Sequence, residues 1–201
     1  MSKVKGLQVY DNFLSDQYLN HLKDVFMWSQ MIDWKVNLSS RGEREELEKK
    51  IFDTQMVCEL IKTPYFISSH TKFLCPFLDI MPWTYRAKVN VTFPSEKEPY
   101  YLGHHTDQPE LDRKHDYYSG IFYMNDSDGY TEVIDPKKLT KKKVDCVENR
   151  LVVFPGHWNH TGTTPTNTKA RFIINFVFFG EFYPEDIRKT EDNYMKQMLN
   201  N

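Results

Sequence analysis

The sequence of 201 residues contains no long hydrophobic run. Its longest apolar stretch, residues 172–179, has Asn175 inside it and is far shorter than the roughly 20 residues that a membrane-spanning helix needs. The first residues are positively charged, but no apolar run of about 7 to 15 residues follows them, so they do not resemble a secretory signal. We therefore expect a soluble, cytoplasmic protein with no membrane partner.

Cysteine is scarce, and neither sign of charge dominates. The three cysteines, Cys58, Cys75 and Cys146, are far apart and odd in number, which favours buried free thiols over a disulfide framework. The formal net charge is -2 at pH 7, so the chain as a whole does not attract nucleic acid. We interpret the basic stretch 137–143 as a solvated connection between two strands.

Apolar residues make up 40% of the chain, which is enough for one well-covered core, and we expect one domain over residues 1–201. Ser15 is a good helix N-cap, and apolar residues recur with helical spacing over 18–26. A second helical stripe runs through the charged segment from Arg41 and ends at Cys58. Residues 73–81 predict a third helix, in which Pro76 has to lie near the first turn.

From Thr84 onward the texture changes to short runs rich in β-branched and aromatic residues, separated by turn residues. The predicted strands are 85–92, 100–105, 117–124, 130–134, 144–147, 151–154 and 171–179. About seven short strands are typical of a sandwich or barrel. The sequence thus indicates a mainly β, α+β fold, with helical support over about 11–81 and a β core over about 84–180.

One histidine and one carboxylate lie two residues apart in His105-Thr106-Asp107. In extended backbone, side chains at i and i+2 point to the same face, so both can bind one metal, whereas His104 would point the other way. His160 is the candidate third ligand, with His157 as its competitor. Two His and one Asp on one face suit iron(II) better than zinc, because the opposite coordination positions stay open.

Arg171 begins the last predicted strand and its alternation of Arg171, Ile173, Asn175 and Val177. A guanidinium group can hold a carboxylate through two parallel charge-assisted hydrogen bonds. The order H-x-D, distal His, then Arg is the most specific signal in the chain. Arg86 and Lys88 can equally bind substrate or lie on a polar strand face.

These motifs resemble a known family. The runs Gly103 to Asp107, Ile121 to Asn125, Asp128 to Thr131, Asn149 to Gly156 and His160 to Gly162 look like the Fe(II)/2-oxoglutarate dioxygenases, within the prolyl 4-hydroxylase-like branch. The opening 9–14 also resembles the first strand and helix cap of that branch. The resemblance implies a double-stranded β-helix, a jelly-roll and cupin-like core, with the N-terminal helices packed on one sheet.

The resemblance also implies roles for individual residues. His105, Asp107 and His160 would bind the iron, and His160-Thr161-Gly162 matches the distal motif of the family. Arg171 and Tyr123 would share the distal carboxylate of 2-oxoglutarate, and Asn90 would also touch this co-substrate. The cofactors implied are Fe(II), 2-oxoglutarate and O2, with ascorbate left open as an auxiliary reductant.

The reaction implied is hydroxylation of a C–H bond, with release of succinate and carbon dioxide. Related halogenases carry a small residue in place of the carboxylate, so Asp107 favours hydroxylation. The branch suggests a peptidyl residue, prolyl or another, as substrate, and free amino acids are the other option. A metal-binding cupin-like module or isomerase without oxygenase activity is the alternative. The oligomeric state stays open, homo-oligomers included.

Overall fold

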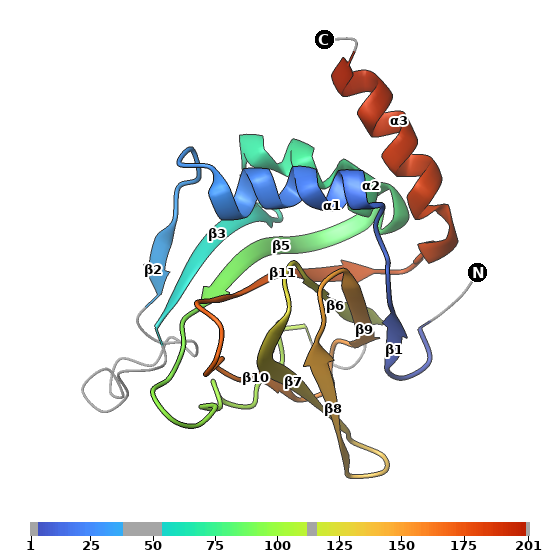
Figure 1. The fold of residues 1–201 in the computed structure, drawn as a ribbon. Coiled ribbons are helices and arrows are strands. Elements are labelled where there is room, and N and C mark those ends of the chain that lie inside the picture. The colour runs from blue at the N-terminus through green and yellow to red at the C-terminus, as the bar shows by residue number, and fades with distance from the viewer. Residues whose placement is uncertain (1–3, 38–53, 112–115, 200–201) are drawn as a thin grey trace.

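The structure is a computed structural model that describes residues 4–37, 54–111 and 116–199. Antiparallel strands form two sheets that face each other, and the helices cover the outer face of the larger one (Figure 1). Within the described ranges, no helix is long and apolar enough to cross a membrane.

The larger sheet has eight strands. Its order is β1 (Gln8–Tyr10), β9 (Arg150–Pro155), β6 (Tyr117–Tyr123), β11 (Arg171–Phe179), β5 (Trp83–Thr92), β3 (Gln55–Lys62) and β2 (Lys35–Asn37), and β4 (Phe66–Ile67) also pairs with β3. The smaller sheet contains β10 (His160–Gly162), β7 (Ser127–Asp135) and β8 (Thr140–Cys146) in that order. The two sheets enclose the interior in which the predicted site residues lie.

The helices pack together on one face of the larger sheet (Figure 1). They are α1 (Asp16–Lys23), continued by the π-helical turn η1 (Asp24–Trp28); the 3-10 turn η3 (Ser69–Leu74), continued by α2 (Cys75–Ile80); and the 3-10 turn η4 (Pro184–Asp186), continued by α3 (Ile187–Leu199). Ser15 caps α1 by accepting a hydrogen bond from the backbone N–H of Tyr18. Pro76 lies in the first turn of α2, as predicted.

Strand β11 shows how the alternation of side chains divides the core. Ile174, Phe176 and Phe178 point towards the helices, where Phe176 stacks on Phe77 of α2 with ring centroids 4.9 Å apart. Arg171 and Ile173 point the other way, into the space between the sheets. Because β11 is central, one strand supports the apolar core on one face and the polar site on the other.

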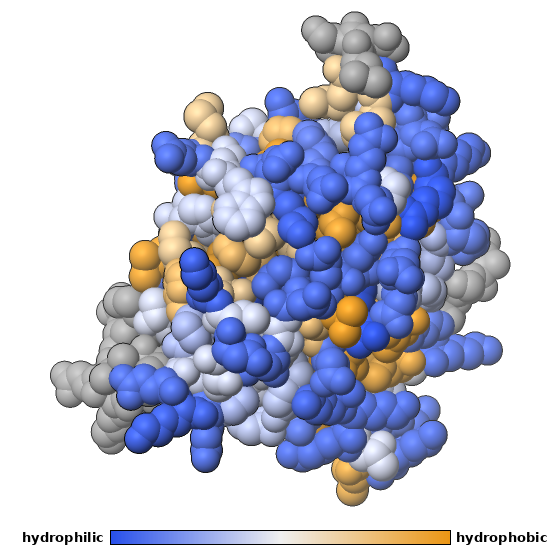
Figure 2. Space-filling model, in the orientation of Figure 1, coloured by the Kyte–Doolittle hydropathy of each residue, from blue (hydrophilic) through white to orange (hydrophobic). Residues whose placement is uncertain are grey.

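The fold-class prediction is confirmed: antiparallel strands form facing sheets of a jelly-roll kind, and the N-terminal helices pack on one of them. Apolar side chains exposed on the face of Figure 2 gather only in small, separate areas among hydrophilic ones.

The predicted second helix is wrong at its C-terminal end, while its part within 38–53 lies outside the described residues. Cys58 lies in β3, which pairs with β5. A β-bulge between Glu59 and Ile61 places both Cys58 and Ile61 on the helix-facing side of the sheet. Residues on both faces of β3 are buried, so its apolar residues do not alternate as they would in a half-exposed strand.

The predicted strand 100–105 is also wrong. This segment forms only two isolated bridges, Tyr101 with Thr163 and His105 with His160, and Gly103 between them has a φ of 95°. A left-handed residue at this point prevents a continuous ladder. The basic stretch is a connection only at its start, because residues 136–139 form the turn and Thr140–Cys146 is already β8.

Candidate metal and ligand site

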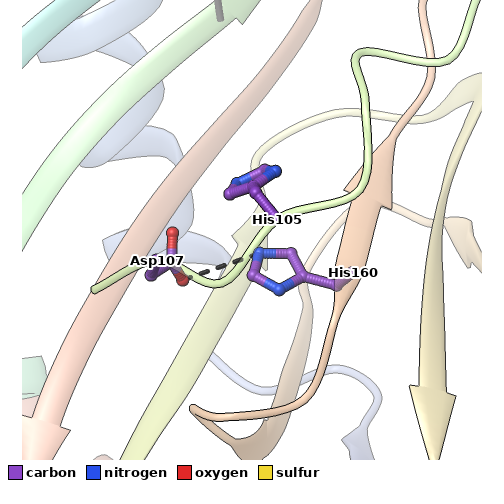
Figure 3. A group of neighbouring side chains, drawn as sticks. All are labelled: His105, Asp107 and His160. Atoms are coloured by element: carbon purple, nitrogen blue, oxygen red, sulfur yellow. Dashed lines mark ion pairs between the residues drawn. The ribbon is translucent and has the colours of Figure 1, made fainter. Parts of the chain in front are cut away.

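Three side chains converge between the two sheets. His105 and Asp107 come from the loop that precedes β6, and His160 is the first residue of β10 (Figure 3). One nitrogen or oxygen atom of each lies within 4.8 Å of the others, a spacing that can hold a metal ion. The backbones of His105 and His160 exchange two hydrogen bonds of 3.0 Å, which fixes the loop against β10.

Hydrogen bonds orient both imidazole rings. Nδ1 of His105 lies 2.9 Å from the carbonyl oxygen of Gly103, and Nδ1 of His160 lies 3.3 Å from that of Trp158. A carbonyl oxygen can only accept, so each Nδ1 carries the proton and donates. Nε2 of each ring is then a free lone-pair donor for a metal.

The carboxylate of Asp107 is held from two sides. Ser119 Oγ donates to its Oδ2 over 2.7 Å, and Asn175 Nδ2 lies 3.3 Å from the same oxygen. Oδ2 also lies 3.6 Å from Nε2 of His160, the contact dashed in Figure 3, which is an ion pair only when His160 is protonated. These contacts fix the orientation of Asp107 before any metal is bound.

Burial and charge set the protonation of this group. Burial opposes ionisation of Asp107, but the positive charges of His160, His105 and Lys88, together with the Ser119 hydrogen bond, outweigh it and lower its pKa to about 2. Burial lowers the pKa of His160 to about 4. At neutral pH the pair is therefore a carboxylate and a neutral imidazole, the forms that a divalent metal ion requires.

A cavity extends from these three residues along the inner face of the larger sheet. Its lining includes Gln55, Lys88, Asn90, Thr131, Gly162, Arg171 and Asn175, with the three converging residues. Nη2 of Arg171 donates to Oγ1 of Thr131 over 2.9 Å, and the Tyr123 hydroxyl donates to the same oxygen over 2.8 Å. The guanidinium carbon lies 5.4 Å from the centroid of the Tyr123 ring.

Small residues make room for Arg171, which is 1% exposed. A Cβ atom at Gly162 would lie 3.1 Å from Nη1 of Arg171, and one at Gly129 would lie 3.1 Å from its Cδ. Both distances are tighter than ordinary contact, so the two glycines of the smaller sheet leave room for the Arg171 side chain between the sheets.

Three buried side-chain atoms in the described part of the chain have no hydrogen-bond partner: Arg171 Nε, Asn90 Oδ1 and Asn175 Oδ1. All three residues line this one cavity. An unsatisfied buried polar group costs about 1–3 kcal/mol. Unpaired donors and acceptors that gather in a single cavity are therefore expected where a polar ligand completes the hydrogen bonding.

The structure brings the predicted site residues together, except that Tyr123 does not line the cavity itself. Arg171 and Asn90 line the cavity, whereas Tyr123 lies behind it and reaches it through Thr131. Of the competing histidines, His104 bonds to Glu132 through Nε2 over 2.9 Å, and His157 is exposed. Neither belongs to the converging group.

Sequence reasoning missed Thr131, Ser119, Asn175 and Gln55 as site residues. Asn175 carried a usable signal, since it shares the alternation of Arg171 along β11. Ser119 carried a weaker signal: it is a small polar residue inside an apolar strand. For Arg86, the sequence left substrate binding and a place on a polar strand face equally open. In the structure Arg86 pairs with Glu59, to which its Nε donates over 2.8 Å.

Comparisons with known proteins place the fold. No protein-family model matches the chain. No curated protein matches it either. Among solved structures, an oxidoreductase of the 2OG-Fe(II) oxygenase family from Burkholderia pseudomallei has a TM-score of 0.63 and 10% identity, covering 89% of this chain and 88% of that one.

Two other structures are similar over most of their length. A prolyl hydroxylase from Trichoplax adhaerens, in complex with a hypoxia inducible factor peptide fragment, has a TM-score of 0.60 and 16% identity, covering 92% of this chain and 86% of that one. The epimerase SnoN, in complex with Fe3+, alpha ketoglutarate and nogalamycin RO, has a TM-score of 0.61 and 11% identity, with 87% and 78% covered. The chain therefore has the fold of the 2-oxoglutarate and Fe(II) oxygenases. Prolyl hydroxylases are among the proteins that share it.

Proposed function

We propose that this protein is an Fe(II)- and 2-oxoglutarate-dependent oxygenase that hydroxylates a C–H bond. The observation that carries the proposal is the shared cavity: three metal-ligating groups lie in one part of it, and a buried guanidinium group with an unpaired N–H lines the same space. A protein that only bound a metal would need the three ligating groups, but it would not need a buried guanidinium group with an unpaired N–H in the same cavity.

The donor set fits iron. His105 and His160 each offer an imidazole nitrogen, which in His160 is neutral, and Asp107 offers an ionised oxygen. Two His and one carboxylate that leave other positions open are typical of non-haem Fe(II) oxygenases. When bound, the iron supplies the redox chemistry that couples oxidative decarboxylation of 2-oxoglutarate, to succinate and carbon dioxide, with transfer of one oxygen atom to the substrate.

The other cavity residues hold the co-substrate. Arg171 would bind the distal carboxylate of 2-oxoglutarate through its guanidinium N–H groups. Oγ1 of Thr131 already accepts from Arg171 and Tyr123, so its own proton can be donated to the same carboxylate. Tyr123 thus acts by positioning, and Asn90 would supply a further polar contact from β5.

Hydroxylation of a peptidyl or free amino acid is the reaction we favour. Asp107 keeps the carboxylate ligand, and one of the structures with this fold is a prolyl hydroxylase in complex with a peptide fragment. Ascorbate would act only as an auxiliary reductant. Three expectations stay predictions: that the protein acts in the cytoplasm, that residues 1–201 form one domain, and that nucleic acid is not a partner.

Succinate formation tests this function. Protein reconstituted with Fe(II) and 2-oxoglutarate without oxygen should form succinate once oxygen is admitted. His160→Ala should abolish this product, Arg171→Ala should shift the 2-oxoglutarate requirement to much higher concentration, and His157→Ala, a neighbouring histidine outside the cavity, should change neither. A wild-type protein that binds iron but neither binds nor consumes 2-oxoglutarate would instead be the metal-binding module or isomerase.

A further inference from the structure

Among the described residues that line the cavity, Lys88 is the one whose charge the proposed reaction does not use. It lies on β5 two residues before Asn90, and both side chains line the cavity, while Ala87 and Val89 pack against the helices. A lysine on this inner face carries its charge into a largely enclosed space. Burial lowers the pKa of Lys88 to about 8, so the ammonium form still predominates at neutral pH.

The carboxylates near Lys88 are already engaged. Glu59, directly across from it on β3, accepts two hydrogen bonds from Arg86, of 2.8 and 3.2 Å. Asp107 accepts from Ser119 and Asn175 and belongs to the metal site. Among the residues that the structure describes, none forms an ion pair with Lys88.

Lys88 is also far from the proposed co-substrate clamp. In the register of β11 with β5, Arg171 pairs with Thr92 and Asn175 pairs with Lys88. The two cations are therefore four residues apart along the sheet, about 13 Å at roughly 3.3 Å per residue. Asn175, which pairs with Lys88, contacts the metal-ligand candidate Asp107, so Lys88 is at the end of the cavity where the metal ligands lie.

The formal charges of the cavity residues also point to Lys88. Arg86 and Glu59 cancel each other. Arg171, Lys88 and Asp107 together leave one positive charge, and a divalent iron with a doubly ionised 2-oxoglutarate adds none. With the co-substrate clamped at Arg171, the uncompensated charge belongs to Lys88, and burying it without a partner is unfavourable. Asn175, across from Lys88, adds an unpaired amide oxygen.

Resting on the proposed function, we infer that Lys88 binds a carboxylate of the primary substrate and places the neighbouring C–H bond beside the metal site. The substrate class this assigns is a compound with a free carboxylate, such as a free amino acid or a peptide C-terminus, in preference to a residue inside a peptide chain. Lys88 would then determine specificity, while Arg171 serves the co-substrate.

Paired acids and amides test the inference. The free L-amino acids, their primary amides, and dipeptides with free or amidated C-termini are offered to protein loaded with 2-oxoglutarate. Binding is followed by saturation-transfer NMR with Zn(II) as the metal, and succinate formation is followed with Fe(II). At least one acid should bind and stimulate succinate formation, with its amide weaker by about tenfold or more. The dipeptides show whether the carboxylate that binds is that of a free amino acid or that of a peptide C-terminus.

Three variants link that preference to Lys88. Lys88→Met should remove the advantage of the acid over its amide and leave the affinity for 2-oxoglutarate unchanged, while Lys88→Arg should retain part of the advantage. Lys62→Met, an exposed lysine of β3, should retain all of it. An amide that binds as well as its acid overturns the inference, as does an acid preference that survives in Lys88→Met.

Other outcomes separate this inference from the proposed function. If 2-oxoglutarate binds and Lys88→Met weakens that binding, Lys88 serves the co-substrate and the inference is wrong while the oxygenase proposal stands. If 2-oxoglutarate binds and no compound with a free carboxylate does, the inference is again wrong by itself. If 2-oxoglutarate does not bind to wild-type protein, both fail together.

Discussion

Arg171 and Thr131 are joined by a buried hydrogen bond of 2.9 Å between Nη2 and Oγ1. They lie on different sheets, Arg171 on β11 and Thr131 on β7. The same Thr131 oxygen accepts the Tyr123 hydroxyl. One hydroxyl group thus fixes the guanidinium and phenol groups on which the proposed carboxylate clamp depends.

Thr131→Val should destabilise the protein and weaken 2-oxoglutarate binding. Valine has nearly the same shape but leaves two buried donors without an acceptor, at a cost of about 1–3 kcal/mol each. Denaturant unfolding measures the loss of stability, and calorimetry measures the affinity. Thr168→Val, which removes a weaker 3.2 Å contact with Ser127, is the control. Equal effects of the two substitutions would contradict this role of Thr131.

Ser119→Ala should weaken metal binding. Without the 2.7 Å hydrogen bond from Ser119, Asp107 loses its main orienting contact. Loss of such an outer contact typically costs 10- to 100-fold in metal affinity. Metal titration of this variant and of Ser69→Ala, an exposed serine, gives the comparison. Unchanged affinity in Ser119→Ala would mean that Asn175 alone is enough to orient the carboxylate.

Gly162→Ala should impair 2-oxoglutarate binding and leave the metal site intact. The added methyl carbon would lie 3.1 Å from Nη1 of Arg171, so the guanidinium group has to move. The expected result is a higher 2-oxoglutarate requirement at unchanged metal affinity. In the control Gly120→Ala, the methyl carbon would meet Phe176 at an ordinary 3.5 Å. A normal 2-oxoglutarate requirement in Gly162→Ala would show that the close approach is unimportant.

Acid should destabilise the metal-free protein through His160. Its pKa is about 4 in the folded protein and about 6.5 when unfolded, so the unfolded state takes up the proton first as pH falls. Stability should therefore be fully present above pH 6.5 and decrease by about 3 kcal/mol on the way to pH 4. Asp107, with its pKa lowered to about 2, adds a further loss below about pH 4.

Unfolding free energies of metal-free wild type and His160→Leu between pH 7 and 4 check this dependence. The variant should show a flatter curve, because leucine takes up no proton in either state. Equal slopes for the two proteins would show that His160 does not carry the effect.

The sequence predicted those parts of the fold in which local pattern and tertiary environment agree. The alternation of β11 predicted its strand and the shared face of Arg171, Ile173 and Asn175, which all line the cavity. The helical spacing that was read up to Cys58 failed, because both faces of β3 are buried and its apolar residues do not alternate. The strand prediction also failed at residues 100–105, where Gly103 interrupts the pairing that the aromatic residues suggested.

Helix α3 was missed for a different reason. Its inner face includes Glu191, which is 2% exposed and accepts hydrogen bonds from the backbone N–H of Ser15 at the start of α1. A buried charge that caps another helix looks like a solvent-exposed residue in the sequence. Contacts across 176 positions of the chain leave no local pattern.

For the site, the H-x-D spacing predicted His105 and Asp107, strand alternation predicted the face of Arg171, and His160 came from the resemblance of His160-Thr161-Gly162 to the distal motif of the family. Thr131 could not be predicted in the same way, since its role comes from the packing of one sheet on the other. Lys88 was visible as a strand residue, but the absence of an ion pair to it among the described residues depends on Arg86 engaging Glu59. Such relationships require the three-dimensional structure.

The most direct test of the central claim is calorimetric titration of 2-oxoglutarate into the protein, with and without Mn(II), for wild type and Arg171→Ala. The account predicts binding that requires the metal and is strongly weakened by loss of Arg171, because one ligand would contact both ends of one cavity. Metal-independent binding, or binding that is equal in wild type and Arg171→Ala, would contradict it.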